Sequence, residues 1–192
     1  MPGGAAHASV PAMLQVRFHG RGGQGVVTAA ELLSVAAFND GLHAQAFPSF
    51  GSERTGAPVM AYCRIGDAPI RTREPVVAPD ALVIQDPTLL HLPEVFAGFE
   101  DGCILVNSAR APELGRGRVV AVPATELART HLGRPLPGAP LLGALAAATG
   151  AVSLAAIAAA FRERFPGPVG EGNVAAAEAA HALVAESRMR TA

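Results

Sequence analysis

A glycine-rich segment near the start of the chain holds the residue types best suited to binding an anion. It consists of six consecutive residues: Gly20, Arg21, Gly22, Gly23, Gln24 and Gly25. A predicted strand precedes it and a predicted helix follows it, which is the context in which G-x-G-x-x-G binds phosphate. Glycines permit positive φ and let backbone N–H groups approach an anion, and the helix N-terminus adds a partial positive charge. Arg21 adds a forked donor beside them.

Three hypotheses about this segment stay open on the residues alone: an anion-cradling turn, a purely structural glycine turn and a dinucleotide site. A dinucleotide site uses an acidic residue near the end of the second strand to bind the ribose. Asp40 has about the right spacing from Gly20, but it falls in an Asn-Asp-Gly turn that ends the helix, and strand 43–47 has no carboxylate. The first two hypotheses are therefore favoured.

A second candidate is the loop over residues 50–56, which contains Ser52, Glu53 and Arg54. Glycine and proline punctuate this part of the chain too often for a strand or a helix. A Glu–Arg pair among glycines is typical of a solvated turn, and it also suits an adaptable binding loop. In a parallel sheet, this loop and the glycine-rich segment both lie at strand ends, where open α/β folds bind ligands.

Other polar residues that follow strands are interpreted as structural. Asp86 precedes Pro87 and is expected to cap the next helix, and Asn107 is interpreted in the same way. His19 is expected to be a hydrogen-bonded core histidine rather than a group that faces a ligand. The sequence contains no nucleophile elbow, HExxH, CxxC, Walker box or paired-carboxylate constellation, so these residues predict no independent enzyme.

Composition narrows the class of protein. Of 192 residues, 50% are hydrophobic and 16% charged, with a net charge of −1, which excludes a disordered chain and leaves no positive field for nucleic acid or an anionic membrane. All 15 basic residues are arginines, which excludes Schiff-base chemistry and a Walker lysine. The alanine-rich stretch 141–160 is too interrupted for a membrane span. We expect a cytoplasmic protein without nucleic-acid or membrane partners.

Two cysteines, Cys63 and Cys103, are present. They can supply neither a disulfide framework nor, alone, the ligands of an iron–sulfur cluster. We expect two small buried thiols in a reduced compartment, and no metal or cofactor bound by this chain alone.

Hydrophobic periodicity predicts the elements that position these residues. Strands are expected over residues 13–19, 43–47, 59–65, 81–85, 103–107 and 119–122. Helices are expected over 26–38, 125–132, 141–149, 154–164 and 173–188, with another through Leu89, Leu92 and Phe96. A turn at Gly66 and Asp67 predicts a hairpin-like return of strand 59–65 toward residues 69–71.

Strands that alternate with helices predict an α/β fold. We expect a Rossmann-like, mainly parallel sheet flanked by helices, with a hairpin-like antiparallel element and a helical C-terminal third. Residues 1–11 are expected to be a flexible N-terminus, and residues 12–192 a single domain.

Several motifs, in order along the chain, resemble the gamma subunit of 2-oxoacid:ferredoxin oxidoreductases, in particular the pyruvate and 2-oxoisovalerate members. They are RFHGRGGQGVVTAAE at 17–31, QAFPSFGSERTGAPV at 45–59, PIR at 69–71, PD at 79–80, VIQDPTL at 83–89, LGRP at 132–135, LGA at 142–144 and RFPG at 164–167. The resemblance covers about residues 14–185. Long motifs in order are far more specific than one glycine fingerprint.

The resemblance implies a subunit of an enzyme complex that oxidatively decarboxylates a 2-oxoacid, pyruvate or a branched-chain one, with coenzyme A. The products are an acyl-CoA, CO2 and reduced ferredoxin. It further implies that alpha and beta subunits hold thiamine diphosphate and Mg²⁺, and that beta and a ferredoxin-like delta subunit hold [4Fe–4S] clusters. The gamma chain is then an assembly subunit, inactive alone, that lends the glycine-rich segment and the loop at Glu53 and Arg54 to coenzyme A.

One departure from the family concerns the second loop, because many relatives carry Arg where this chain has Thr55. Either Arg54 supplies the charge instead or the contact is absent. Two alternatives to the leading hypothesis remain: a stand-alone nucleotide-binding oxidoreductase built on the glycine-rich segment, and a ligand-free scaffold domain.

Overall fold

The computed structural model of the chain describes residues 13–49 and 55–191, so the expectation of a flexible segment at 1–11 falls outside the described residues. Within them, one six-stranded sheet has the strand order β2-β3-β1-β4-β5-β6. Its strands are β1 (Met13–Arg21), β2 (His43–Pro48), β3 (Pro58–Gly66), β4 (Ala81–Ile84), β5 (Cys103–Asn107) and β6 (Arg118–Val122). Every predicted strand is present, with ends that differ by a residue or two.

The sheet is mixed. β3 runs antiparallel to both of its neighbours, β1 and β2, whereas β1–β4, β4–β5 and β5–β6 pair in parallel. The predicted fold class, a mainly parallel sheet with an antiparallel element, is confirmed. The predicted return over residues 69–71 is wrong, because β1 and β2 already occupy both edges of β3 and leave no edge for another strand.

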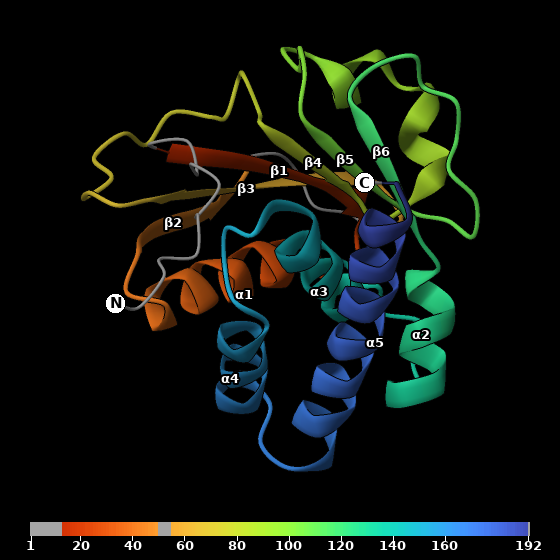
Figure 1. The fold of residues 1–192 in the computed structure, drawn as a ribbon. Helices are drawn as coiled ribbons and strands as arrows, with labels where there is room; N and C mark the ends of the chain where they lie inside the picture. Colours follow the sequence, from red (N-terminus) through yellow and green to blue (C-terminus); the bar gives the residue numbers. More distant parts are fainter. Residues whose placement is uncertain (1–12, 50–54, 192) are drawn as a thin grey trace, which may run out of the picture.

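The α-helices gather on one side of the sheet, with α1 directly beneath β1 and β3 and with α4 and α5 farther out (Figure 1). They are α1 (Val26–Asn39), α2 (Ala124–Leu132), α3 (Gly138–Thr149), α4 (Leu154–Arg164) and α5 (Pro168–Thr191). Helix α5 begins earlier than predicted, at Pro168. A proline fits the first position of a helix, because a backbone N–H there would have no partner within the helix. No helix in the described residues is both long and apolar enough to cross a membrane.

The opposite side of the sheet is covered differently. Where the sequence predicts one helix through Leu89, Leu92 and Phe96, the chain forms two short 3-10 helices, η1 (Pro87–His91) and η2 (Pro93–Phe96). Pro93 interrupts the run because it has no N–H to donate to the preceding turn. These helices pack over β4, β5 and β6, on the side away from α1 (Figure 1).

Alternation along the strands divides the core between the two sides. Val16 and Phe18 of β1, together with Val83 of β4, belong to the larger cluster that packs against the α-helices. Leu82 and Ile84 belong to the second cluster, beneath η1 and η2. Because β1 and β4 are buried, they fix the positions of the loops that follow them.

Two buried arginines fasten the segments before and after β4 to the sheet. Arg17 donates to the carbonyl oxygens of Val76, Val95 and Ala97 at 2.8–3.2 Å. Arg64 donates to the carbonyl of Glu74 at 2.7 Å. Both side chains are buried, and these bonds compensate for removing their charges from water.

Candidate functional site

The glycine-rich segment lies at a topological switch point of the sheet. The chain leaves β1 for α1 on one side and leaves β4 for η1 on the other, so the two connections diverge from neighbouring parallel strands. Open α/β sheets bind ligands in the crevice outside such strand ends. Side chains bridge this crevice: Gln24 donates to Asp86 at 2.9 Å, and Arg21 donates to Thr88 at 2.9 Å.

Backbone geometry leaves the end of the segment open to a ligand. Gly23 and Gly25 have φ values of 92° and 72°, in the left-handed region, and open space lies where a side chain would stand on either of them. Gly25 is the N-cap of α1 and provides no side-chain cap, and the first turn of α1 contains no acidic residue. The unpaired N–H groups of that turn therefore face outward with the positive end of the helix dipole.

A hollow of about 270 Å³ lies at this helix N-terminus. Its lining is Arg21, Gly22, Gly23, Gly25, Val26, Val27, Thr28 and Val59. Backbone amides, one hydroxyl and one guanidinium border it, which is the donor set that an anion such as phosphate requires.

Gly20 has a different, structural role. A Cβ at this position would stand 2.5 Å from Cγ2 of Val26 and 3.3 Å from Cβ of Gln85. Only a glycine lets the end of β1 pass between the start of α1 and the end of β4. The structural hypothesis therefore describes Gly20, while Gly23 and Gly25 have the geometry of a ligand-facing turn.

Arg21 is held within the crevice rather than projecting freely into solvent. Its Nε lies 3.3 Å from Oδ2 of Asp86, and Nη1 donates to the carbonyl of Gly56 at 3.1 Å. Burial tends to raise the pKa of the Asp86 carboxyl, but hydrogen bonds from Thr88 and Gln24 and the charge of Arg21 together hold that pKa below its usual value. Asp86 is thus a carboxylate at neutral pH, and its negative charge partly neutralises the positive charge of Arg21.

The second candidate loop is only partly described. Ser52, Glu53 and Arg54 lie outside the described residues. The last part of the loop meets the glycine-rich segment: Gly22 forms a parallel bridge with Thr55, and the Gly22 N–H donates to the carbonyl of Ala57 at 2.9 Å. The prediction that both loops share one end of the sheet is confirmed for this part of the loop.

The predicted caps are present. Asp86 accepts from the Thr88 backbone N–H at 3.0 Å at the start of η1, and Asn107 accepts from the Thr125 N–H at 3.1 Å in the first turn of α2. Asp40, the residue spaced for a ribose, instead accepts from the Ser153 N–H and hydroxyl at 2.5 and 2.7 Å, at the start of α4. Its carboxylate is therefore committed to a helix end far from the glycine-rich segment.

His19 is a core residue, as predicted. Its side chain is buried, and its Nε2 accepts from Nε of Arg17 at 3.0 Å. Burial, together with the neighbouring charge of Arg17, lowers the pKa of His19 to about 3. The imidazole is neutral and positions Arg17.

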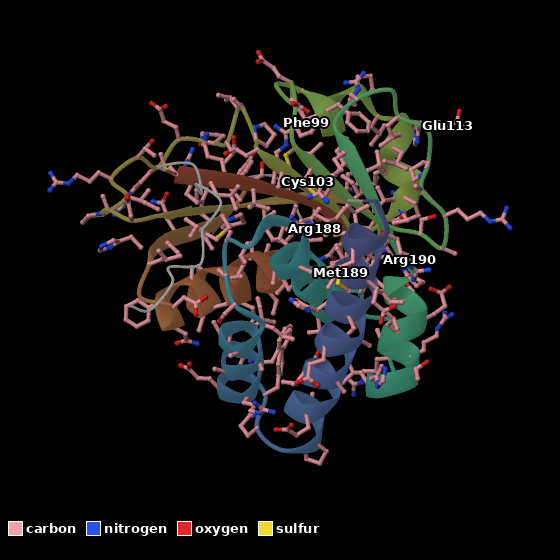
Figure 2. The ribbon with its side chains drawn as sticks, in the orientation of Figure 1. Phe99, Cys103, Glu113, Arg188, Met189 and Arg190 are labelled. Carbon is pink, nitrogen blue, oxygen red and sulfur yellow. The ribbon has the colours of Figure 1, made fainter. Side chains whose placement is uncertain are left out.

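Both cysteines are buried free thiols, as expected from the sequence. Burial raises the pKa of each, and for Cys103 the charges of Arg118 and Arg188 partly oppose the rise. Figure 2 shows Cys103 in the sheet and Arg188 near the C-terminal end of α5. In the described residues, no group of three His, Cys, Asp or Glu side chains is arranged to hold a metal ion.

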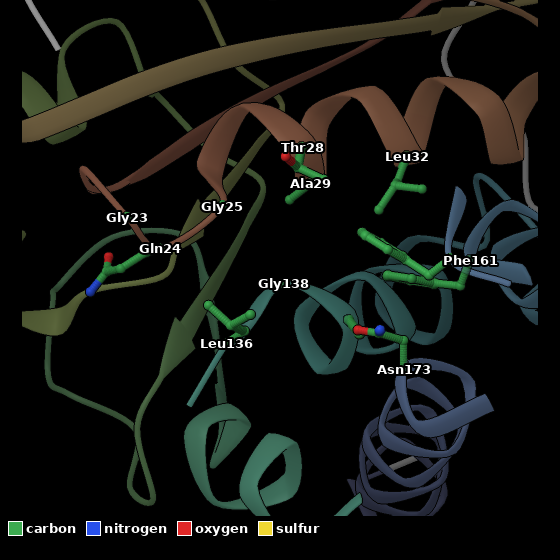
Figure 3. Close-up of a pocket in the computed structure, with 12 residues that line it drawn as sticks. Gly23, Gln24, Gly25, Thr28, Ala29, Leu32, Leu136, Gly138, Phe161 and Asn173 are labelled. Atoms are coloured by element: carbon green, nitrogen blue, oxygen red, sulfur yellow. The ribbon is translucent and has the colours of Figure 1, made fainter. Parts of the chain in front are cut away.

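A second cavity, of about 210 Å³, was not predicted from the sequence. It lies on the helical side of the glycine-rich segment, between α1, the start of α3, the end of α4 and α5 (Figure 3). Its apolar lining includes Leu32, Leu136 and Phe161. Gln24, Thr28 and Asn173 add polar side chains, and Gly23 and Gly25 also line it. Its residues come from four separate parts of the chain, so no local pattern could reveal it.

Comparison with known proteins assigns the family. The family model for pyruvate ferredoxin/flavodoxin oxidoreductase matches residues 15–183. The chain belongs to the pyruvate ferredoxin/flavodoxin oxidoreductase family. The resemblance seen in the sequence motifs is thereby confirmed.

Relatives within the pyruvate ferredoxin/flavodoxin oxidoreductase family match nearly end to end. The chain is 48% identical over 170 residues to pyruvate synthase subunit PorC of Methanothermobacter marburgensis, which spans 88% of this chain and 96% of that protein. It is 46% identical over 176 residues to the pyruvate/ketoisovalerate oxidoreductases common subunit gamma of Thermococcus kodakarensis, with 88% and 95% covered. The crystal structure of pyruvate oxidoreductase subunit PORC from Thermotoga maritima superposes with a TM-score of 0.79 at 38% identity, covering 89% of this chain and 96% of that one.

Proposed function

We propose that the chain is the gamma subunit of a multi-subunit, thiamine-diphosphate-dependent 2-oxoacid:ferredoxin oxidoreductase. The complex converts pyruvate or a branched-chain 2-oxoacid and coenzyme A into an acyl-CoA, CO2 and reduced ferredoxin. Alpha, beta and delta subunits are its partners, and ferredoxin accepts the electrons. The chain acts as one domain over residues 12–192, in the cytoplasm, and has no activity alone.

Within the complex, this chain contributes a binding surface rather than redox groups. A [4Fe–4S] cluster takes four thiolates, and the chain has two cysteines, both buried in separate strands. Thiamine diphosphate, Mg²⁺ and the clusters therefore belong to the partner subunits in this proposal.

One observation carries the role toward coenzyme A: the hollow at the uncapped N-terminus of α1. Gly23 and Gly25 bring backbone N–H groups to its surface without side chains in the way, and Arg21 borders it. Coenzyme A presents phosphates, which suit an anion-binding turn in a chain that has no lysine. We also propose that Ser52, Glu53 and Arg54, which lie outside the described residues, contact coenzyme A, with Arg54 supplying the charge that many relatives carry at position 55; if Arg54 does not, the contact is absent.

A role in assembly is supported by the apolar surface. Phe38, Val77 and Met189 are each at least 74% exposed, and burying these side chains against partner subunits would be favourable. We expect the thermal stability of the purified chain to rise on mixing with its partners.

Co-expression tests the proposal. The chain together with alpha, beta and delta subunits should yield a brown complex that reduces ferredoxin or a viologen dye with a 2-oxoacid and coenzyme A, whereas the chain alone should do neither. Titration of the full chain with adenosine 3′,5′-bisphosphate should show saturable binding. A yellow preparation that binds NAD would favour the stand-alone oxidoreductase. Assembly without any bisphosphate binding would leave a ligand-free scaffold.

A further inference from the structure

Strand β6 forms the edge of the sheet that lies nearest to the C-terminal end of α5 (Figure 1). The Arg118 N–H donates to the carbonyl of Gly102 at 2.7 Å, on the side of β5. In a parallel pair every second residue bonds to the neighbouring strand, so Arg118 and Val120 face β5. The N–H and C=O groups of Val119 and Ala121 therefore point away from the sheet, and within the described residues they have no partner.

The two edges of the sheet differ in how they are protected. An open strand edge pairs readily with other chains, and a proline on the edge opposes such pairing. On β2, the Ser49 N–H donates to the carbonyl of Met60 at 2.9 Å, so the alternate position, Pro48, faces away from β3. β6 reads Arg-Val-Val-Ala-Val, with no proline and no charge after its first residue. Such an edge is typical of a strand that pairs with another chain.

A hollow of about 490 Å³ lies beside this edge, between β6 and the C-terminal part of α5. β6 lines it with residues 118–121, α5 lines it with Leu183, Val184, Ser187 and Arg188, and Ala111 completes it. Leu183 is 47% exposed, so an apolar part of α5 faces water here. Since side chains alternate along a strand, a strand added to β6 would place every second side chain over this hollow.

The lining of the hollow carries positive charge. It includes Arg118 and Arg188 and, among the described residues, no acidic side chain. Nη2 of Arg118 donates to the carbonyl of Ala148 at 2.7 Å, and Nη1 of Arg188 donates to the carbonyl of Ala147 at 2.6 Å. The last turn of α3 thus holds both guanidinium groups in place. A guanidinium has five N–H donors, so Arg118 keeps donors for a carboxylate.

A second copy of this chain fits the β6 edge poorly. Antiparallel pairing of two β6 strands about a two-fold axis would bring Arg118 and Arg188 of both copies to the same place. Like charges placed together across an interface repel each other. The charge of the hollow therefore favours an acidic partner over a homodimer.

We propose that β6 is the docking edge for an extended segment of a partner subunit, which adds a strand to the sheet and places a carboxylate beside Arg118. Hydrogen bonds to the backbone of Val119 and Ala121 give such a complex affinity, and the side chains over the hollow give it specificity. The inference rests on the proposed function for the source of the segment, which is an alpha, beta or delta subunit.

Amide hydrogen exchange tests strand addition directly, on the full chain alone and in the complex co-expressed with alpha, beta and delta subunits. The outward amides of Val119 and Ala121 should exchange at least about ten-fold more slowly in the complex. The amide of Val120, which faces β5, should be protected in both samples. A photo-crosslinking residue at position 183 should link to an acidic segment of a partner subunit.

Ala121→Pro removes one outward N–H without breaking a bond to β5, and edge strands accept proline. The partner subunits should bind this variant about ten-fold more weakly, while the thermal midpoint of the chain alone changes little. Ala44→Pro is the matched control, because Ala44 occupies an outward-facing position on β2, the other edge strand. The control should leave the association unchanged.

Two substitutions at Leu183 test the charge without altering the strand. Leu183→Glu and Leu183→Lys remove the same apolar contact at a half-exposed site, so both variants should fold. Only the glutamate would repel a carboxylate on the partner. Leu183→Glu should therefore weaken the association more than Leu183→Lys does.

The outcomes separate the two proposals. If the complex assembles but the amides of Val119 and Ala121 exchange as fast as in the chain alone, the docking edge is wrong and the proposed function stands. Unchanged association of Ala121→Pro, cross-links to a second copy of this chain, or equal effects of the two Leu183 variants would also overturn the docking proposal alone. If the chain does not assemble with alpha, beta and delta subunits at all, the proposed function falls as well.

Discussion

Gln24 locks the glycine-rich segment to the neighbouring strand through Asp86. Its Nε2 donates to Oδ2 of Asp86 at 2.9 Å, while its Oε1 accepts from the backbone N–H of Arg21 at 2.7 Å. One side chain therefore fixes both the turn and the carboxylate across the crevice. The hollow at the start of α1 is preorganised, but Arg21, which lines it, is paired with the negative charge of Asp86, and the effect of this charge is open to test.

Asp86→Asn should strengthen binding of adenosine 3′,5′-bisphosphate. The substitution removes a negative charge next to Arg21 and releases Arg21 from its ion pair. The asparagine oxygen can still cap η1, but the asparagine NH2 then faces Nε2 of Gln24, so the bond from Gln24 is lost. We expect a gain of about two- to five-fold, equivalent to ~0.5–1 kcal/mol for a partly exposed pair, measured by titration calorimetry. Asp67→Asn, on the exposed turn after β3, is the matched control. Weaker binding in Asp86→Asn would mean that Asp86 positions the site more than it repels the ligand.

Two substitutions of Gly25 distinguish the effect of backbone strain from the effect of blocking the ligand. Gly25→Val is strained at φ 72°, whereas asparagine tolerates this conformation and adds similar bulk to the open space. In the assembled complex both variants should raise KM for coenzyme A, but only valine should lower the thermal midpoint, by the equivalent of ~1–2 kcal/mol. A raised KM confined to the valine variant would assign the effect to strain alone.

His19 should make the fold sensitive to acid. Its pKa is about 3 in the folded chain against 6.5 ordinarily, so between these values the unfolded chain binds a proton that the folded chain does not. The stabilisation is complete above pH 6.5 and is lost as pH falls through this window, at up to about 1.4 kcal/mol per pH unit.

His19→Gln retains an acceptor for Arg17 and removes the titration. Denaturant unfolding between pH 7 and 4 should therefore show a shallower decline for this variant, whereas the exposed His43→Gln keeps the original slope. Equal slopes for all three proteins would refute the assignment.

Asp40 is predicted to matter for stability and not for ligands. Asp40→Ala removes two hydrogen bonds at the start of α4 and should cost ~1–2 kcal/mol in urea unfolding. Bisphosphate affinity should stay the same, because Asp40 lies at the opposite end of α1 from the glycine-rich segment. A double-mutant cycle with Ser153→Ala should show coupling between the two residues. A change in ligand affinity would reopen the dinucleotide hypothesis.

The two thiols should resist labelling in the folded chain. Cys63 is 0% and Cys103 6% exposed, and burial raises the pKa of both thiols. A disulfide reagent at pH 8 should react only as fast as local opening exposes each thiol, with Cys103 first because it is the less buried of the two. In denaturant both should react at once. Rapid labelling of one thiol in the native chain would contradict this.

Local pattern was sufficient to predict the strands and the switch point. The alternation in β1 and the apolar runs of β4 and β5 depend on neighbours a few residues away. The turn at Gly23 and Gly25 could be predicted because glycine is the residue type that adopts positive φ. The division of the predicted helix after β4 into two short ones also has a local cause, Pro93. The prediction gave more weight to the apolar spacing of Leu89, Leu92 and Phe96 than to this proline.

Features that depend on distant partners could not be predicted. Asp40 and Ser153 are 113 residues apart, and nothing near Asp40 indicates which group its carboxylate meets. The Gln85 side chain is buried, and neither its Nε2 nor its Oε1 has a hydrogen-bond partner in the described residues. This too is a property of the packed interior, although a polar residue at the end of an apolar strand was a signal available in the sequence. The family assignment rested on ordered motifs, which carry more information than any one spacing.

The bonds from Arg17 and Arg64 to the segment before β4 and to η2 all end on main-chain oxygens. Such anchoring constrains the path of the backbone while leaving its side chains nearly free. Substitutions at exposed positions such as Arg73 and Ala78 should thus accumulate among homologues at little cost. An insertion or deletion there would displace the carbonyl oxygens that accept these hydrogen bonds. Selection should therefore conserve the length of this segment far more strictly than its amino-acid sequence.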